Sequence, residues 1–301
     1  MKLSVVVPTK NRPSELRVFL NSLWHQVLLP DQLIIIDQSI ERNIIKLEVE
    51  EKAKQLGIKI TYIHDEKING LVQAKASAIR YNNCSIISFF DDDIVLKENC
   101  LNEMYNAFLE NPEMTGANGL ILNAPLESFF RRNIFRLTHF GIYKDNRREA
   151  FYQMIDKSEE QQLPKRLNTL SGGLTFYRKE IFNKVPFDEK NRFHAYEDKE
   201  HSIRLDIHYP NSMYLIPKAK LFHYHVQTNR ESKLTKVKND NIEIIKIYKK
   251  HKKKSLIGID LIFLLVGLFF YAFIKGVKYK NKKYLLNYFN GIKEGINFEI
   301  K

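Results

Sequence analysis

Cysteine is scarce in the sequence, because the chain of 301 residues contains only Cys84 and Cys100. Two thiols cannot form the disulfide framework of a small secreted domain, and their separation does not match the spacing of a cysteine metal site. We therefore expect free thiols and a reducing compartment.

The N-terminus has no long apolar run. Lys2 is followed by the short apolar stretch 3–7, which Pro8 ends before the apolar core of a signal peptide could form. We therefore expect this part of the chain to stay in the cytoplasm.

Two glycine-rich nucleotide motifs are also absent. No GxGxxG follows the first apolar stretch, which argues against a dinucleotide oxidoreductase, and no GxxxxGK[ST] occurs, which argues against a P-loop ATPase. Any nucleotide must be held in another way.

The first third of the chain alternates between short apolar runs and helical patterns. The runs predict four strands, at residues 3–7, 32–39, 58–63 and 86–90. The spacing of apolar residues predicts helices between them, and Ser14 stands where it could cap the first helix. This alternation predicts an α/β fold with a doubly wound, mostly parallel sheet, in which ligands bind beyond the carboxyl ends of the strands.

Three consecutive carboxylates, Asp91, Asp92 and Asp93, directly follow the fourth predicted strand. Adjacent acids repel one another, so a divalent cation bound to phosphates would stabilise them here. A solvated acidic turn is the alternative for an isolated triplet. Residues 8–12 and Asp37 follow two other strands and should reach the same edge of the sheet, which favours a binding site.

The segments 4–13, 36–39 and 90–93 resemble motifs of the family 2 nucleotide-sugar glycosyltransferases, and the resemblance covers about residues 1–230. It implies a Rossmann-like GT-A fold, a nucleotide-diphosphate sugar donor, a divalent cation (Mn²⁺ or Mg²⁺) and inversion at the anomeric carbon. A cation bridging the diphosphate would offset the charge that grows on the leaving group.

By this resemblance, Pro8, Thr9 and Arg12 line the nucleotide site, and Asp37 accepts hydrogen bonds from the base or ribose. The family often has Asp-Asp-Gly-Ser where this chain has Asp37 followed by Gln and Ser, so the second acid is missing. Lys75 stands where the family often has arginine, and it either meets a phosphate or is a solvated helix residue.

The same resemblance places Asp91 against the ribose or donor sugar and makes Asp93 a metal ligand. Asp91 is a second candidate ligand, and Asp92 would orient the other two. The glycines Gly172 and Gly173 would lie against donor and acceptor, because a missing side chain lets the backbone approach a sugar. A tight turn is the alternative for these glycines.

Glu197 and Asp198 match the family's acidic pair at the start of a helix. A carboxylate there could accept the proton of the acceptor hydroxyl as its oxygen attacks, which is general-base catalysis. We expect Asp198 to be the base, with Glu197 as the second candidate. The alternative is that both acids complement the dipole of the helix N-terminus.

His223 and His225 lie two positions apart, on the same side of the chain if the chain is extended. Many GT-A enzymes take a third metal ligand from a histidine near the end of the catalytic domain. We therefore expect His223, or else His225, to bind the metal, with a structural histidine as the alternative.

Most of the net charge of +13 lies in the last part of the chain, where residues 231–301 hold 16 Lys, no Arg and 6 acids. A nucleic-acid surface would mix arginine with aromatic residues, so we expect no nucleic-acid partner. Lysine around an apolar segment favours an anionic membrane surface.

The apolar segment 256–274 contains one charged residue, Asp260. As a helix it would be about 28 Å long, just enough for a hydrocarbon core of about 30 Å. Lysines flank both ends, and the positive-inside rule keeps both ends cytoplasmic. We expect a re-entrant or in-plane segment, bent at Gly258 or Gly267 and followed by a surface helix at 284–292. A single-pass span and a buried core helix are the alternatives.

These features predict a metal-dependent glycosyltransferase of the hexosyltransferase type at the cytoplasmic face of the cell membrane. It would add sugars to a glycan or lipid-linked acceptor in cell-surface polysaccharide synthesis. Single additions are expected, because Trp24 is the only tryptophan and the QxxRW motif of processive synthases is absent.

We expect a catalytic domain at 1–230 and a membrane-associating tail at 231–301. The catalytic domain would have a nucleotide-sugar half at 1–120 and an acceptor and base half at 121–230. A sugar nucleotidyltransferase is an alternative, although residues 8–14 lack its glycine-rich first loop. A non-catalytic membrane adaptor that binds nucleotide sugars is another.

Overall fold

The computed structural model describes residues 1–41, 45–125, 128–155, 157–158, 162–191, 193, 196–226, 232–255 and 258–301. Two sequence predictions fall outside these residues: the domain boundary at 230 and 231, and Leu256 at the start of the apolar segment. The described residues form helices and one sheet, a mixed α/β fold.

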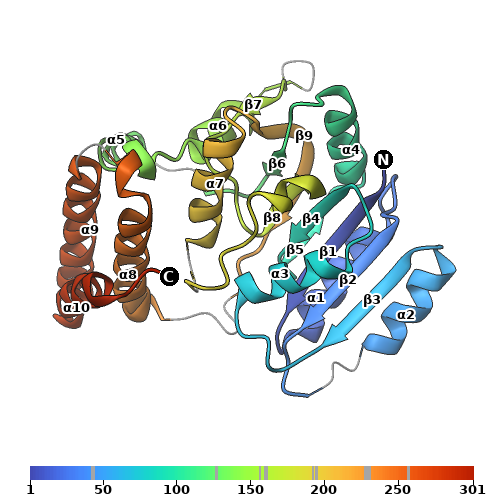
Figure 1. Ribbon diagram of the computed structural model, residues 1–301, viewed down its shortest axis with the longest axis horizontal. Helices are drawn as coiled ribbons and strands as arrows, with labels where there is room; N and C mark the ends of the chain where they lie inside the picture. The colour runs from blue at the N-terminus through green and yellow to red at the C-terminus, as the bar shows by residue number, and fades with distance from the viewer. Residues whose placement is uncertain are drawn as a thin grey trace. The chain divides into compact units, whose positions relative to one another are not determined.

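Four parallel strands form the first half of the sheet, as the sequence predicts (Figure 1). They are β1 (Leu3–Thr9), β2 (Gln32–Asp37), β3 (Lys59–His64) and β4 (Ile86–Phe90). Val5 and Leu33 belong to one core cluster, whereas Val6 and Ile34 belong to another. Burial on both faces explains the apolar runs of β1, β2 and β4, whereas β3, at the edge of the sheet, is only partly buried.

The second half of the sheet is mixed. It contains β5 (Ile94–Leu96), β6 (Gly116–Ile121), β7 (Lys165–Arg166), β8 (Leu174–Arg178) and β9 (Met213–His223). The order across the sheet is β3-β2-β1-β4-β8-β6-β9-β5, and β7 pairs with β9. Only β5, β7 and β8 of the described strands run against the others, so the sheet is mostly parallel, as predicted.

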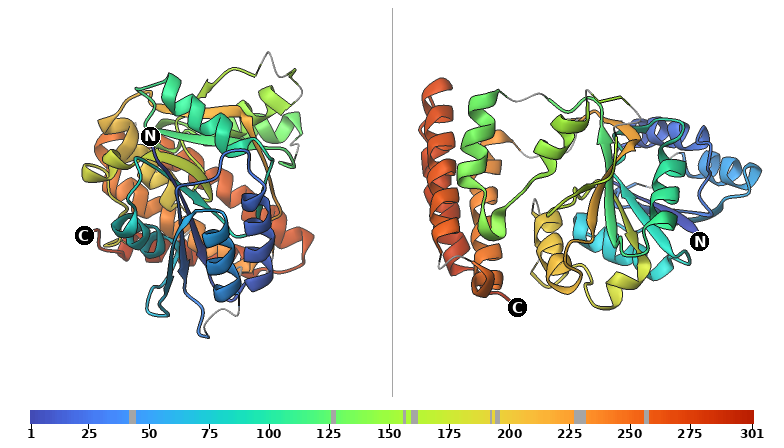
Figure 2. Two further views of the ribbon diagram at one scale, coloured as in Figure 1. Left: turned by 90° about the vertical axis from the view of Figure 1, so that its right-hand side faces the viewer. Right: turned by 90° about the horizontal axis from the view of Figure 1, so that it is seen from above.

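Helices cover both faces of this sheet. Residues of α1 (Pro13–Trp24), α2 (Lys46–Gln55) and α4 (Cys100–Glu110) enter one core cluster, and residues of α3 (Leu71–Tyr81) and α6 (Arg147–Ile155) enter the other. The left view of Figure 2 shows the blue helices α1 and α2 on one side of the strands and the teal α3 on the other. A short 3-10 turn, η3 (Lys179–Asn183), follows β8.

Both cysteines are free, as the sequence predicts, and the structure buries both. Burial raises the pKa of the Cys100 thiol to about 12 and also raises the pKa of Cys84. Both thiols are therefore protonated at neutral pH.

The start of α1 differs from the sequence prediction. The helix begins at Pro13, and Arg12 holds the N-cap position without a side-chain cap hydrogen bond. The expected cap by Ser14 is wrong, because proline has a fixed φ and no N–H and is favoured at the first helical position. Arg12 is thus at the junction of loop and helix.

The chain divides into two compact units. The first contains Met1–Pro125, Asn146–Phe187 and Arg204–Asn229, and it holds the sheet. The second contains Leu126–Asp145, Asp188–Ile203 and Arg230–Lys301. The division of the chain at residue 230 into catalytic domain and tail stays a prediction.

The second unit is helical. Its elements are α5 (Phe129–Thr138), η1 (Gly141–Tyr143), the start of α7 (Glu197–His208), α8 (Lys233–His251), η4 (Lys252–Lys254), α9 (Ile259–Lys278) and α10 (Lys283–Asn297). Its core joins Ile142, Phe193 and Ile203 to Ile244 of α8 and Leu264 of α9. Two short segments from the middle of the sequence therefore share a core with the tail.

The helix α9 covers most of the predicted apolar segment. By length and composition it could cross a membrane, with a mean hydropathy of 2.0. Gly258 precedes it with a φ of 83°, and the helix continues through Gly267, which lies against Thr138. The predicted second surface helix corresponds to α10.

Candidate metal centre and its surroundings

The acidic triplet and His223 meet at the carboxyl end of the sheet. Asp91, Asp92 and Asp93 occupy the turn between β4 and β5, and His223 is the last residue of β9. β5 and β9 are antiparallel neighbours in which Ile94 pairs with His223. This pairing brings the histidine beside the carboxylates, although more than a hundred residues separate them in the sequence.

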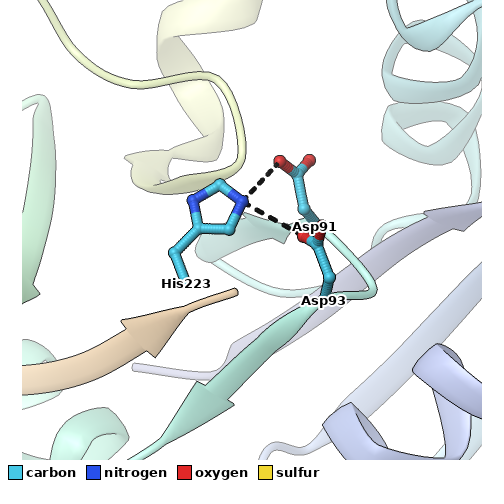
Figure 3. A group of neighbouring side chains, drawn as sticks. All are labelled: Asp91, Asp93 and His223. Carbon is cyan, nitrogen blue, oxygen red and sulfur yellow. Dashed lines mark ion pairs between the residues drawn. The ribbon is translucent and has the colours of Figure 1, made fainter. Parts of the chain in front are cut away.

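Asp91, Asp93 and His223 form a group that could hold a cation. The Nε2 atom of His223 lies 3.1 Å from Oδ1 of Asp93 and 3.6 Å from Oδ2 of Asp91. Figure 3 shows the imidazole pointing towards both carboxylates. All three ligand atoms lie within 4.8 Å of one another.

The donor set and its spacing fit a divalent cation. Neighbouring ligands around an octahedral Mg²⁺ are about 3 Å apart, and carboxylate oxygens suit Mg²⁺ and Mn²⁺. The Nε2 atom of His223 is buried beside both carboxylates, and a neutral imidazole nitrogen in this position could be the third ligand. The predicted ligands Asp91, Asp93 and His223 are thus brought together.

Burial differs sharply within the triplet. The side chain of Asp91 is 31% exposed, whereas that of Asp93 is 1% exposed. Burial raises the pKa of Asp93, but contacts with His223, the Val226 N–H and Arg12 outweigh it and hold that pKa well below its usual range. Asp93 is therefore ionised at any physiological pH.

Asp92 faces the end of β1. Its carboxylate accepts a hydrogen bond of 2.8 Å from the Thr9 hydroxyl and one of 2.6 Å from Arg12. Burial and the negative charges of Asp91 and Asp93 raise the pKa of Asp92, whereas the contacts with Thr9 and Arg12 lower it. Burial is the largest of these effects, and the resulting pKa is about 7. These contacts hold the Asp92 carboxylate against Thr9 and Arg12, and its role in orienting the other two acids stays a prediction.

Arg12 links two acids of the triplet. A second guanidinium nitrogen lies 3.2 Å from Oδ2 of Asp93, and that oxygen also accepts the Val226 N–H at 2.9 Å. Burial lowers the pKa of Arg12, and the carboxylates of Asp92 and Asp93 outweigh burial and raise it. The guanidinium therefore remains charged and holds both carboxylates in place.

His223 is fixed through its backbone by Asn123. The His223 N–H donates to Oδ1 of Asn123 at 2.9 Å, and the Asn123 amide donates to the His223 carbonyl at 3.1 Å. His225 has a φ of 50°, and its ring lies 3.7 Å, between centroids, from that of His223. His225 does not belong to the three-residue group, and metal binding by it stays a prediction.

The glycine-rich loop lies directly on Asp91. The Gly173 carbonyl accepts the Asp91 N–H at 2.9 Å, and a Cβ on Gly173 would come within 2.1 Å of the Asp91 carboxylate. Asn118 accepts the Ser171 N–H at 2.8 Å, and Arg147 donates to the Leu170 carbonyl at 3.0 Å. Gly173 therefore permits the contact, and Gly172 lies next to it in this loop.

Sequence analysis did not identify three residues that support this site: Asn118, Asn123 and Arg147. Asn118 carried no usable signal, because the glycines of β6 are unfavourable in strands and its burial and hydrogen bonds appear only in the folded chain. Asn123 and Arg147 carried none, since each acts on backbone groups that only the folded chain brings near.

The predicted nucleotide residues lie at the ends of β1 and β2. Pro8 pairs in register with Ile36, and Thr9 pairs with Asp37. Asp37 is fully buried and already accepts three hydrogen bonds, from the N–H and hydroxyl of Ser39 at 3.0 and 2.5 Å and from the Tyr62 hydroxyl at 2.8 Å. Its contact with a base or ribose stays a prediction.

Lys75 is buried on α3, with 2% of its surface exposed. Its ammonium lies 5.8 Å from the centroid of the Phe187 ring. The alternative of a solvated helix residue is therefore wrong, because neighbouring elements cover this side chain. Contact with a phosphate stays a prediction.

Glu197 and Asp198 begin α7, in the part of the helix that belongs to the second unit. Oδ1 of Asp198 accepts the Lys199 N–H at 2.7 Å, and the Asp198 carbonyl accepts the Ser202 hydroxyl at 2.7 Å. Glu197 is buried, whereas Asp198 is partly exposed. The roles of both acids in catalysis stay predictions.

Comparison with known proteins gives a family match over most of the chain. Residues 4–186 match the family described as "Glycosyl transferase family 2". No curated protein sequence matches the chain.

Three solved structures share the fold at low identity. TarS from S. aureus is 18% identical with a TM-score of 0.54, and the match covers 83% of this chain and 39% of TarS. GalNAc-T7 with UDP, GalNAc and Mn²⁺ is 13% identical with a TM-score of 0.58, and the match covers 83% of this chain and 48% of GalNAc-T7. Mannosyltransferase PcManGT from Pyrobaculum calidifontis, in complex with GDP-Man and Mn²⁺, is 12% identical with a TM-score of 0.57. The match covers 98% of this chain and 73% of PcManGT.

These likenesses establish the fold as GT-A. The chain spans less than half the length of the first two of these proteins.

Proposed function

The chain belongs to glycosyl transferase family 2, and from this premise we propose that it is a metal-dependent, inverting transferase of the hexosyltransferase type. The reaction moves a single sugar from a nucleotide-diphosphate sugar to a hydroxyl of a glycan or lipid-linked acceptor. The observation that carries the proposal is the group of Asp91, Asp93 and His223 at the carboxyl end of the sheet.

Asp91, Asp93 and His223 would hold Mn²⁺ or Mg²⁺. When bound, the cation would offset the negative charge that develops on the leaving nucleoside diphosphate. Arg12 supports this site because its ion pairs with Asp92 and Asp93 keep the carboxylates oriented. Pro8, Thr9, Arg12, Asp37 and Lys75 are the proposed donor contacts, and Gly172 and Gly173 would let the backbone approach the sugar.

Asp198 is the proposed general base, with Glu197 as the second candidate. The acceptor oxygen attacks the anomeric carbon, the bond from that carbon to the diphosphate oxygen breaks, and the hydroxyl proton passes to the carboxylate. A single displacement of this kind inverts the anomeric configuration. The nucleoside diphosphate leaves with the bonding electrons.

The tail would attach the enzyme to the cytoplasmic face of the cell membrane, beside acceptors of cell-surface polysaccharide synthesis. Support comes from α9, whose length and hydropathy suit a membrane, and from the lysines at both of its ends.

A donor screen tests the proposed function. The full chain is incubated with a panel of nucleotide sugars plus Mn²⁺ or Mg²⁺, and released nucleotide is measured. We expect release with at least one donor, loss of release in Asp93→Ala, and retained donor binding without transfer in Asp198→Asn. Transfer retained in both variants would contradict these roles, and donor binding without turnover by the unmodified chain would indicate an adaptor.

A further inference from the structure

The outer face of α9 is apolar and exposed to solvent. Five of its side chains follow one another at helical spacing and expose between 47% and 64% of their surface: Ile262, Val266, Phe270, Phe273 and Val277. The opposite stripe is buried, with Asp260, Leu264 and Ala272 at most 1% exposed. An exposed apolar face of this length marks an interaction surface.

The buried stripe ties α9 to polar elements of its own unit. Oδ2 of Asp260 accepts the Ile142 N–H at 3.1 Å, and Leu264 packs with Ile244 and Ile247 of α8. Figure 1 shows α8 and α9 running beside each other. A membrane-spanning α9 would carry the charged side chains of α8 into hydrocarbon, which is costly.

The turn between α9 and α10 concentrates positive charge. Lys275 and Lys278 end α9, Lys280 and Lys282 lie in the turn, and Lys283 begins α10. Within the described chain none of these five lysines forms an ion pair. Acids of the second unit pair with other lysines instead: Asp240 with Lys236, Glu294 with Lys238, Glu243 with Lys246, and Asp188 and Glu200 with Lys250. The charge of this turn is therefore uncompensated.

A cavity of about 570 Å³ opens at this turn. Phe273, Val277 and Leu285 give it an apolar lining, and Lys280, Lys282 and Lys283 are also among its lining residues. An apolar lining beside three exposed lysines suits a phosphate that is attached to an acyl chain.

Lys280 occupies a backbone position that normally favours glycine. Its φ is 48°, and hydrogen bonds from Asn281 to the Gly276 carbonyl at 2.9 Å and from Lys280 to the Val277 carbonyl at 3.2 Å close the end of α9. Glycine is the usual residue at such a left-handed helix end, and a lysine there is strained. Backbone strain of this kind occurs most often at functional sites.

We propose that α9 lies in the plane of a membrane surface, with its outer face among the acyl chains, and that the α9–α10 turn binds the phosphate of an anionic phospholipid. This inference rests on the membrane attachment proposed above and assigns its orientation and its lipid. Three further exposed lysines, those of η4, precede the other end of α9. A second copy is a poor occupant, because parallel and antiparallel pairing of α9 would each set lysines against lysines.

The orientation is tested by the depth of single tryptophans. In a Trp24→Phe background, Ile262→Trp, Phe270→Trp and Val277→Trp report on two ends and the middle of the outer face. With lipids brominated at different depths, an in-plane helix predicts the same shallow quenching depth at all three positions. If the tryptophan at position 270 lay deeper than those at positions 262 and 277, the in-plane orientation would be wrong. If no position were quenched, the proposed contact of α9 with a membrane would be wrong.

The lipid site is tested by co-sedimentation with phosphatidylcholine vesicles that contain or lack phosphatidylglycerol. We expect the full chain to bind only the anionic vesicles. K280Q/K282Q/K283Q should weaken that binding on the order of 100-fold, since each lysine near an anionic surface contributes about fivefold. The matched triple K52Q/K54Q/K59Q, which removes exposed lysines of the first unit, should change it by less than about threefold.

Lys280→Gly separates the lipid contact from folding. Glycine relieves the strained φ, so the variant should melt at or above the temperature of the unmodified chain while binding anionic vesicles about fivefold more weakly. If the two triple variants lost vesicle binding equally, the proposed lipid site would be overturned. The same holds if Lys280→Gly bound anionic vesicles as tightly as the unmodified chain. Neither assay uses a sugar donor, so these outcomes are independent of the proposed transfer reaction.

Discussion

Asp91, Asp92 and Asp93 are chemically identical neighbours whose surroundings make them different acids. The pKa of Asp93 is held well below its usual range by His223, Val226 and Arg12 despite burial, whereas burial raises the pKa of Asp92 to about 7. Asp93 is therefore a permanent anion that suits a divalent cation. Asp92 instead takes part in the contacts that hold this turn against β1.

Gly173→Ala tests the contact between the glycine loop and the proposed metal ligand Asp91. The added Cβ would lie about 2.1 Å from a carboxylate oxygen, so Asp91 must move. We expect Mn²⁺ affinity to fall by about 10-fold or more, as for other changes that displace a ligand. Isothermal titration with Mn²⁺ measures this.

The control for that variant is Gly276→Ala, because a Cβ there has no neighbour closer than 3.5 Å and the backbone is helical. Its Mn²⁺ affinity should equal that of the unmodified chain. Unchanged affinity in Gly173→Ala would show that the loop does not position Asp91.

At the residue scale, sequence analysis identified the candidate metal ligands but not the residues whose hydrogen bonds position them. Asp91, Asp93 and His223 were predicted from pattern and resemblance, and the structure brings them together. Asn123 and Arg147 were not predicted, because they bind backbone groups of residues distant in sequence. Lys75 was ambiguous because burial on a helix depends on what packs against it.

At the scale of elements, the strands buried on both faces were predictable from the sequence, whereas β5 and β6 of the mixed half of the sheet were not. β1, β2 and β4 are continuous apolar runs, which local sequence predicts. β6 contains two glycines and an asparagine, all unfavourable in strands, and its pairing with β8 and β9 overrides that preference. β5 is too short for any periodicity to appear.

Two ion pairs in the second unit join α8 to α7 and to the segment before α7. Lys250 contacts both Asp188 and Glu200. Burial raises the pKa of Asp188, but hydrogen bonds from Lys250 and Asn191 outweigh it and lower that pKa. Because the folded pKa lies below the unfolded value, Asp188 stabilises the fold above about pH 4, and this contribution is lost as pH falls through the folded pKa.

Asp188→Asn should therefore destabilise the chain in a pH-dependent way. We expect the free energy of unfolding to fall by about 2 kcal/mol at pH 7, since hydrogen bonds to a charged group are lost. The difference from the unmodified chain should shrink at pH 3, where Asp188 approaches protonation. Urea unfolding at both pH values measures this, and an equal difference at both would show that the charge of Asp188 has no part in stability.

At the scale of the whole molecule, composition predicted a basic, membrane-directed tail, but not that the tail shares a core with earlier segments. Ile142, Tyr143, Phe193 and Ile203 pack with Ile244, Ile247 and Leu264. Sequence patterns report which side chains are apolar, whereas the partner that buries them is fixed by tertiary packing.

Truncation after residue 230 tests the predicted domain division. Each buried side chain that loses its partners costs about 1.5–3 kcal/mol, so four of them cost an amount comparable with the 5–15 kcal/mol that stabilises a typical domain. We expect the truncated chain to aggregate or to melt without cooperativity in a thermal scan. Cooperative melting at the temperature of the full chain would instead establish residues 1–230 as an independent domain.

Calorimetric titration of nucleoside diphosphates into the full chain tests the central claim, a cation held by Asp91, Asp93 and His223 that grips the donor diphosphate. With Mn²⁺ present, the unmodified chain should bind at least one nucleoside diphosphate, and it should lose that binding in EDTA. Asp93→Ala should bind none under either condition. The same binding heat in Asp93→Ala, or binding that does not change in EDTA, would contradict the account.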